Sequence, residues 1–353
     1  MRATTDDGPR AGSGQWTNQT LEQAAPGVFR IPLPLPGDGL RAVNVYALVH
    51  EGRATLVDSG WSFGPGLEVL EAGLAELDLD LGQVDRVLVT HMHRDHYTLG
   101  IRLRSLLGTR VLIGAGERES IEAVLSGRAD AQRSWLSRWG ADALRPLLAA
   151  QPATSPSQYG LPDEWIDGPS DLRVGDRTLR AIPTPGHTRG HLVFLDERAG
   201  LLFAGDHVLP RITPSIGVES PRAELALASF LDSLQVVREL PDLALLPAHG
   251  ALGRRTHERV DELVEHHRAR LATTAAAVVA GATTAYDVAR ALAWTSRDKA
   301  FTELDPHNKF LAVAETAAHL DVLVRDGVLV AEQTSGVDTF AASPGGTHAH
   351  RAQ

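Results

Sequence analysis

Residues 91–96 read His-Met-His-Arg-Asp-His, and no other stretch of the chain is as informative. Its three imidazoles and one carboxylate follow the apolar run Val87-Leu88-Val89, which predicts a buried strand. Such a strand would deliver these side chains to the edge of a sheet, where they fan out along a loop. Neutral imidazole and carboxylate groups are typical ligands of zinc, iron and manganese. The other interpretation is a His-rich surface loop.

Three further segments repeat one pattern: a short apolar run, a turn of small residues, and a side chain that can bind metal. They are Thr184-Pro185-Gly186-His187-Thr188, Ala204-Gly205-Asp206-His207 and Pro247-Ala248-His249-Gly250. Glycine allows the backbone to bend tightly beside an ion, where a Cβ atom would crowd it. Four segments with this pattern favour a metal centre over a His-rich surface loop.

This set of motifs resembles the metallo-β-lactamase superfamily of dinuclear hydrolases, and the resemblance spans residues 27–250. It implies two divalent metal ions, zinc first, with iron or manganese as alternatives. It also implies seven protein ligands. One ion would be held by His91, His93 and His187, the other by Asp95, His96 and His249, and Asp206 would bridge the two.

Two positions indicate a branch of the superfamily. Members that carry out di-iron oxygen chemistry usually have Glu at the position of His93. The true β-lactamases usually have Cys in place of the bridging Asp206, and this chain has no Cys. The pattern therefore resembles the glyoxalase II-like hydrolases.

The resemblance implies a mechanism in which two ions acidify a bridging water, and the resulting hydroxide attacks a small ester. A thioester or a lactone is the expected substrate, and Asp95 is the candidate catalytic residue, since it could both bind metal and orient the hydroxide. Asp58 resembles the buried Asp that the family places near the site; the alternative is a capping Asp in a turn. His207 is expected to be a bystander or part of the pocket wall, and His191 is left undecided.

The composition narrows the class of partners. The net charge of −10 argues against a general nucleic-acid surface, because affinity for phosphates depends on Lys and Arg. We therefore expect a small-molecule substrate and no nucleic acid, and a homo-oligomer stays open. No apolar run approaches the ~20 residues that span a bilayer, and residues 1–14 lack an apolar leader segment, so no membrane contact and a cytoplasmic location are expected.

The expected fold is α+β, a four-layer αβ/βα metallo-β-lactamase sandwich with the metals at one edge of its two sheets. Residues 1–26 would be a tail and lead-in, and 27–254 the catalytic domain. Strands are expected at 28–33, 43–49, 54–57 and 84–89, and helices at 66–77 and 131–148. A helical cap is expected at about 116–165, where Trp135 and Trp139 either anchor a helix on the core or wall the substrate pocket.

Residues 255–342 predict a second, winged-helix-like domain. The pattern predicts helices at 255–279, from Thr283 or Thr284 to Trp294, and from Pro306 to about Val324, followed by a hairpin around residues 334–336. The superfamily branch that includes a mitochondrial endoribonuclease carries a similar C-terminal domain. His266 and His267 are expected to face water, and residues 343–353 to form a disordered tail.

That similarity makes an endoribonuclease the alternative function, with a basic rim to which Tyr97, Arg211 and Arg222 would contribute. The third predicted helix of the second domain mixes acidic and basic residues, which weakens the case for nucleic acid. A non-catalytic, metal-dependent binding protein is the third alternative, and a complete set of ligands argues against it.

Overall fold

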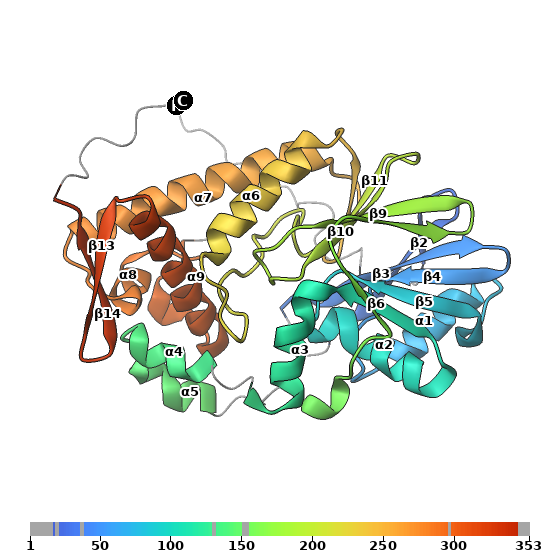
Figure 1. Ribbon diagram of the computed structural model, residues 1–353, viewed down its shortest axis with the longest axis horizontal. Helices are drawn as coiled ribbons and strands as arrows, with labels where there is room; N and C mark the ends of the chain where they lie inside the picture. Colours follow the sequence, from blue (N-terminus) through green and yellow to red (C-terminus); the bar gives the residue numbers. More distant parts are fainter. Residues whose placement is uncertain are drawn as a thin grey trace, which may run out of the picture.

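The computed structural model describes residues 17, 21–35, 39–128, 132–149, 155–295 and 298–344. Most of the predicted N-terminal tail and residues 345–353 of the predicted C-terminal tail lie outside these residues. Two large sheets, a set of flanking helices and a small hairpin make up the described part (Figure 1).

The first sheet has seven strands, which are neighbours in chain order. They are β1 (Glu22–Ala25), β2 (Val28–Pro34), β3 (Ala42–His50), β4 (Arg53–Val57), β5 (Val84–Val89), β6 (Arg110–Gly114) and β7 (Glu164–Ile166). Strands β1 to β4 pair antiparallel, whereas β4 to β7 pair parallel. The parallel part brings the carboxyl ends of β4 and β5 to one edge, where the motif at residues 91–96 begins.

The second sheet has five strands in the order β12-β11-β10-β9-β8. They are β8 (Ser170–Val174), β9 (Arg177–Pro183), β10 (Leu192–Asp196), β11 (Leu201–Gly205) and β12 (Ala244–Pro247). Strands β11 and β12 pair parallel, so their carboxyl ends also meet at one edge. The loops that begin at these ends carry Asp206 and His249.

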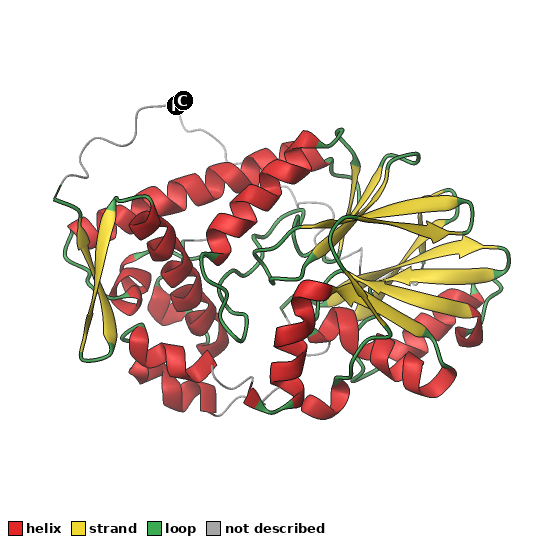
Figure 2. Ribbon diagram, in the orientation of Figure 1, coloured by secondary structure: helices red, strands yellow, loops and turns green. Residues whose placement is uncertain are grey.

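The two sheets pack face to face through a shared apolar core, in which Tyr46 of β3 meets Phe203 of β11 edge to face at 5.3 Å. Helices α1 (Gly66–Ala75), α2 (Arg94–Leu107) and α3 (Arg118–Leu125) cover the outer face of the first sheet. Helices α6 (Ala226–Glu239) and α7 (Thr256–Val279) cover the second (Figure 2). The expected four-layer αβ/βα sandwich is confirmed, because each sheet buries one face against the other sheet and one against helices.

A helical C-terminal domain follows the sandwich. Helix α7 leads into α8 (Ala285–Ala291) and α9 (Pro306–Arg325), and the hairpin of β13 (Leu329–Thr334) and β14 (Val337–Ala342) turns at residues 335–336. Thr284, one of the two candidates, caps α8 in a capping box with Asp287. Helix α8 ends before the predicted Trp294, which instead forms an isolated bridge with Lys299.

The single helix expected at 131–148 is wrong. The chain instead forms α4 (Gln132–Arg138), a 3-10 turn at Asp142–Leu144 and α5 (Arg145–Ala149). The break lies at Gly140, whose φ of +71° ends a helix. Trp139 is buried in the core of the C-terminal domain against Phe310 of α9, so the anchoring interpretation of this tryptophan is confirmed.

No helix within the described ranges combines the length and the apolar character that crossing a membrane requires.

Candidate metal centre

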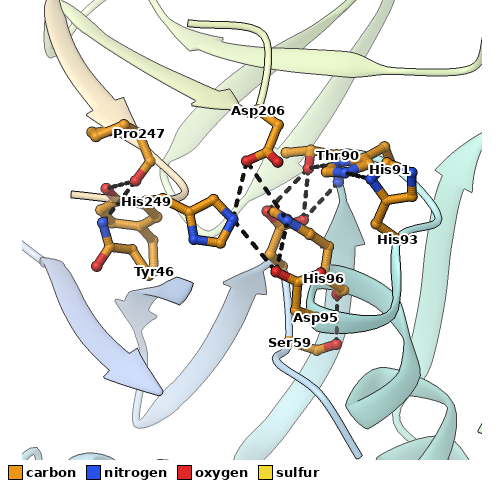
Figure 3. A network of polar contacts seen from close by, with 12 residues as sticks. Tyr46, Ser59, Thr90, His91, His93, Asp95, His96, Asp206, Pro247 and His249 are labelled. Atoms are coloured by element: carbon orange, nitrogen blue, oxygen red, sulfur yellow. Dashed lines mark hydrogen bonds and ion pairs between the residues drawn. The ribbon is translucent and has the colours of Figure 1, made fainter. Parts of the chain in front are cut away.

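All seven predicted metal ligands lie in loops, or at the start of a helix, just beyond strand ends. His91 and His93 follow β5, His187 follows β9, Asp206 follows β11 and His249 follows β12. Asp95 and His96 occupy the first turn of α2, whose start at Arg94 directs them back to the same edge. Figure 3 shows that side chains from both sheets converge there. The structure thus brings together every side chain that the four motifs predicted to meet.

A first group contains three imidazoles and one carboxylate, from His91, His93, His187 and Asp206. The Nε2 atoms of His91 and His187 lie 3.0 and 2.9 Å from Nδ1 of His93. The three nitrogens therefore form a tight triangle, the spacing expected around one small cation.

The tautomers of two of these histidines follow from their outer partners. Nδ1 of His187 lies 2.7 Å from the carbonyl of Ser215, which can only accept, so Nδ1 carries the proton. Nδ1 of His91 contacts the Thr90 hydroxyl, whose own proton goes to the carboxylate of Asp58. Both rings consequently turn an unprotonated Nε2 toward His93, which is the form that binds metal.

A second group contains Asp95, His96 and His249. Nδ1 of His249 donates to the carbonyl of Ala42 at 2.8 Å, and Nδ1 of His96 lies 2.8 Å from Oδ2 of Asp58. Asp58 also accepts from the backbone N–H of Thr90. This buried carboxylate holds both the His96 ring and the strand end before His91, so its expected place beside the site is confirmed.

Asp206 stands between the two groups. Its Oδ2 lies 3.5 Å from Nε2 of His187, and its Oδ1 lies 3.3 Å from Nε2 of His249. Each oxygen therefore faces a different group of imidazoles, the arrangement that a bridging carboxylate requires.

The donor atoms fit divalent cations. Nε2 of His96, Nε2 of His249 and Oδ1 of Asp206 are buried and have no hydrogen-bond partner within the described part of the chain. Buried acceptors without donors are costly unless a cation lies among them. Burial disfavours a charged His96, yet the carboxylates of Asp95 and Asp58 raise the pKa of His96 to about 10, so without a metal ion its Nε2 holds a proton whose place a metal ion would take. The site thus has a surplus of negative charge that a cation would balance.

The loop of Asp206 depends on His191, which the sequence left undecided. The backbone N–H of Asp206 donates to Nε2 of His191 at 3.2 Å, and Nδ1 of His191 faces the Thr184 hydroxyl at 2.9 Å. Gly205 has a φ of +51°, and a Cβ atom there would come within 2.7 Å of Nε2 of His191. His191 is therefore a positioning residue for Asp206, and Gly205 allows the close approach.

Three more positioning residues carry no sequence signal. The amide of Asn44 and the hydroxyl of Tyr46 both donate to the carbonyl of Pro247, which holds the loop before His249. Glu117 accepts from the Thr188 hydroxyl beside His187 and from the backbone of Met92. Burial, with the nearby Glu219, raises the pKa of Glu117 to about 8. None of the three belongs to a motif, because their partners lie far away in the chain.

Two aromatic residues and part of the predicted cap lie near the centre. Trp61 and Phe63 follow β4 and contact each other at 5.2 Å, and the Arg94 guanidinium lies 4.4 Å from the centre of the Trp61 ring. Phe63 is 60% exposed. The indole N–H of Trp61 donates to Gln158. The loop at 156–161, which is part of the predicted cap, therefore approaches the metal-binding motif.

Two expectations about individual histidines have opposite outcomes. His207 is fully buried against Phe230, with ring centroids 5.0 Å apart, and belongs to neither ligand group, as expected. The expectation that His267 faces water is wrong, because its side chain is fully buried between helices. His266, its neighbour, is exposed as expected.

The model of the metallo-beta-lactamase superfamily matches residues 38–249, which include all seven predicted ligands. The chain belongs to this superfamily. Among curated relatives, it is 24% identical to the probable metallo-hydrolase YqjP of Bacillus subtilis (strain 168), over 84% of this chain and 91% of that protein. It is 29% identical to an atrochrysone carboxyl ACP thioesterase of Aspergillus fumigatus, over 65% of this chain and 42% of that protein.

Two solved superfamily structures resemble nearly the whole chain. A metallo-beta-lactamase family protein from Thermus thermophilus has a TM-score of 0.72 and 27% identity, covering 91% of this chain and 100% of that one. A beta-lactamase domain protein from Burkholderia ambifaria has a TM-score of 0.75 and 29% identity, covering 91% and 94%. This coverage extends well beyond the sandwich, so most of the C-terminal helices also have counterparts in these proteins.

Proposed function

We propose that this superfamily member is a dinuclear metal-dependent hydrolase of small esters, with a thioester as the first candidate substrate and a lactone as the second. The observation that carries the proposal is the Asp206 carboxylate, whose two oxygens face different groups of imidazoles. In this proposal His91, His93 and His187 hold one ion, Asp95, His96 and His249 hold the other, and Asp206 bridges them. Zinc suits the donors best, although iron and manganese also accept imidazole and carboxylate.

Two divalent ions, when bound, lower the pKa of a water and polarise a substrate carbonyl. Asp95 is the proposed catalytic residue because its carboxylate faces Nε2 of His249 at 3.4 Å at this centre. Burial opposes its ionisation, but the neighbouring His96 and His249 lower the pKa of Asp95 to about 2. An ionised Asp95 can accept a hydrogen bond from the attacking water and orient it.

Apolar side chains beside the centre support an acyl substrate. The exposed ring of Phe63 and the ring of Trp61 offer an apolar surface, and Arg94 adds a positive charge next to the motif. An acyl thioester of an acidic carrier presents both an apolar chain and negative charge. The relative from Aspergillus fumigatus that is described as an acyl-carrier thioesterase points to the same class of bond.

The decisive experiment assays metal-loaded protein against panels of acyl-CoA, acyl-glutathione and lactone substrates. We expect turnover of thioesters first and lactones second. Elemental analysis should find at least two metal equivalents per chain, and a maximum of one under saturating metal would overturn the dinuclear assignment. Absence of turnover with every ester, together with efficient RNA cleavage, would overturn the substrate class.

The endoribonuclease alternative has less support from the surface. Tyr97, one of three residues named for a basic rim, is fully buried and donates to the carbonyl of Gly160. Arg222 pairs with Asp321 of α9 and lies over the Trp135 ring. Of the three residues, Arg211 is the exposed one. The three residues named for the rim therefore do not form an exposed basic surface. They give no support to nucleic-acid binding by a winged-helix-like domain.

Titration of labelled RNA and duplex DNA at two ionic strengths tests this alternative. We expect weak binding with a shallow dependence on salt, because the net charge of −10 leaves no excess of cations to displace counterions from nucleic acid. Submicromolar binding at physiological salt would instead favour the ribonuclease. Metal binding without turnover of any ester or nucleic acid would favour the third alternative, a non-catalytic binding protein.

A further inference from the structure

A second group of potential ligands lies outside the metal centre, between helices α7 and α9. His266 and His267 of α7 and Glu315 of α9 each offer one ligand atom, and these atoms lie within 4.8 Å of one another. Figure 1 shows α7 running along the C-terminal domain beside α9, and the two helices are in contact. His267 is fully buried and His266 is exposed, so the group extends from the core to the surface.

Hydrogen bonds from α9 determine the tautomer of His267. Nδ1 of His319 lies 2.7 Å from the backbone carbonyl of Glu315, which can only accept, so His319 is protonated on Nδ1. Its Nε2 is then an acceptor, and it lies 3.2 Å from Nδ1 of His267. His267 therefore donates from Nδ1 and keeps the lone pair on Nε2.

This Nε2 atom has no partner of its own. It is buried and makes no hydrogen bond to any described residue. Its nearest candidate ligand neighbours are the imidazole of His266 and the carboxylate of Glu315, and an ionised carboxylate can only accept. Nε2 of His267 is thus a buried acceptor without a donor, in a group that also contains the half-buried Glu315 carboxylate, and such an acceptor is unfavourable unless a donor or a cation reaches it.

We propose that His266, His267 and Glu315 bind a divalent cation of the zinc class, separate from the metal centre, with water completing its coordination. Two imidazoles and a carboxylate are common zinc ligands, and in a tetrahedral site the ligand atoms stand about 3.4 Å apart. The three ligand atoms lie within 4.8 Å of one another, so they would move closer together on binding an ion. His319 would be the outer partner that orients the ligand His267, as carboxylates and carbonyls do in other metal sites.

The nearby cation Arg270 is engaged elsewhere in part, although its Nη2 is buried without a hydrogen-bond partner among the described residues. Its guanidinium donates to the carbonyl of Ala293 at 2.8 Å and lies 3.9 Å from the centre of the Trp294 ring. Burial raises the pKa of the Glu315 carboxyl, while Arg270 acts in the opposite direction. A bound divalent ion would favour the ionised carboxylate more strongly than the Arg270 charge does, because it would contact the oxygen directly.

The position of the site gives it a structural role. An ion there would link α7, which packs on the catalytic sandwich, to α9 in the core of the C-terminal domain. The Phe230 ring lies between His267 and His207, with ring centroids 5.5 and 5.0 Å away, and His207 directly follows Asp206. The ion would therefore brace the helices that pack behind the metal centre.

The test is the number of zinc equivalents per chain after loading with excess Zn²⁺ and removal of free metal. His266→Ala removes an exposed ligand, and Glu315→Gln removes the carboxylate at nearly constant volume. Both should hold one equivalent less than the wild type and retain its ester turnover. His307→Ala, an exposed histidine at the start of α9, and Glu265→Gln, an exposed glutamate of α7, are the matched controls and should hold the wild-type number.

The difference between variant and wild type does not depend on how many ions the metal centre holds, so the proposed function can fail without affecting this result. Zn²⁺ should also raise the unfolding temperature of the wild type by more than that of His266→Ala, since the ligand binds only the folded chain. Equal metal content and equal thermal shifts in wild type and His266→Ala would overturn the proposal and leave a bridging water between the two acceptors. Loss of metal in the control variants as well would overturn it too, as an unspecific effect.

Discussion

Each imidazole of the metal centre whose tautomer the structure defines is oriented by a group that lies outside the centre. The carbonyls of Ala42 and Ser215 and the carboxylate of Asp58 hold the Nδ1 side of three rings. The Nε2 atoms face inward, where metal ions would bind them. Single residues behind the proposed ligands are therefore expected to contribute to metal binding.

Asp206→Asn is expected to lower metal content and to reduce turnover by at least about a hundredfold, the scale of losing a metal-activated nucleophile. The amide has one oxygen and no charge, so it cannot balance two ions. Turnover per folded molecule and metal content are the measurements. His207→Ala is the neighbouring control and should have a much milder effect. Equal behaviour of the two variants would show that Asp206 is not the bridging ligand.

Gly205→Ala tests the close approach beside His191. The new Cβ atom would come within 2.8 Å of the Thr90 side chain and 2.7 Å of Nε2 of His191, in addition to the cost of a positive φ. We expect displacement of Asp206 and loss of most turnover and metal. Gly200→Ala has a similar φ of +66° with nothing within 4 Å, so it should cost only about 1 kcal/mol of stability and no activity. Full activity of Gly205→Ala would contradict the tight packing around His191.

Helix α7 is tied at its start to the loop that follows Asp206. Arg259 donates to the carbonyls of Leu209 and Ile212, and Arg254 donates to the carbonyl of Pro210. Glu262 pairs with both arginines. One carboxylate thus connects the first turns of the C-terminal helix to the loop beside the metal centre.

Glu262→Gln should make the free energy of unfolding less dependent on pH in the acidic range. Hydrogen bonds from Arg254, with Arg259, lower the pKa of Glu262 to about 2, below its unfolded value of about 4.3. The pairing therefore contributes stability above about pH 4.3, and this contribution disappears as the pH falls towards 2. Solvent exposure of the side chain keeps it small.

Urea unfolding of wild type and variant between pH 7 and 3 provides the measurement. The stability difference between them should shrink as the pH decreases. Glu258→Gln is the matched control, because Glu258 contacts the same Arg254 but is more exposed. A wild-type advantage that stays constant down to pH 3 would rule out the linkage.

At the scale of the molecule, the C-terminal helices and the sandwich share one core. Val260 and Leu263 of α7, with Val322 of α9, pack in the cluster that covers the second sheet. Trp139, from the segment between the two ligand-bearing halves of the sandwich, packs in turn within the C-terminal cluster. The two parts are therefore expected to fold together.

Truncation after residue 252 should yield protein that is insoluble or lacks small-substrate turnover. It removes α7 and exposes the apolar face of α6 and the second sheet, each buried large side chain contributing about 1.5–3 kcal/mol. Soluble yield, thermal unfolding and ester turnover are the readouts. A chain ended after residue 344 keeps all described helices and strands and should behave as wild type. An active, stable fragment 1–252 would contradict a shared core.

The sequence by itself determined the sandwich and the set of metal-type side chains, because both are local patterns. Strands end at Val89, Gly205 and Pro247, and the motif residues follow within a few positions. Strand ends in parallel sheets must meet at one edge, so the convergence of these side chains could be expected from their positions in the chain.

Only the tertiary structure decided which other side chains hold the proposed metal ligands in place. Asn44 and Pro247 are 203 positions apart, and their hydrogen bond leaves no periodic trace in either segment. The same reason explains His267: the charged residues of its helix suggested a solvated face, but the packing of α7 against α9 and Phe230 buries it. Burial is a property of what packs against a residue, and contacts between distant segments are set by the whole fold.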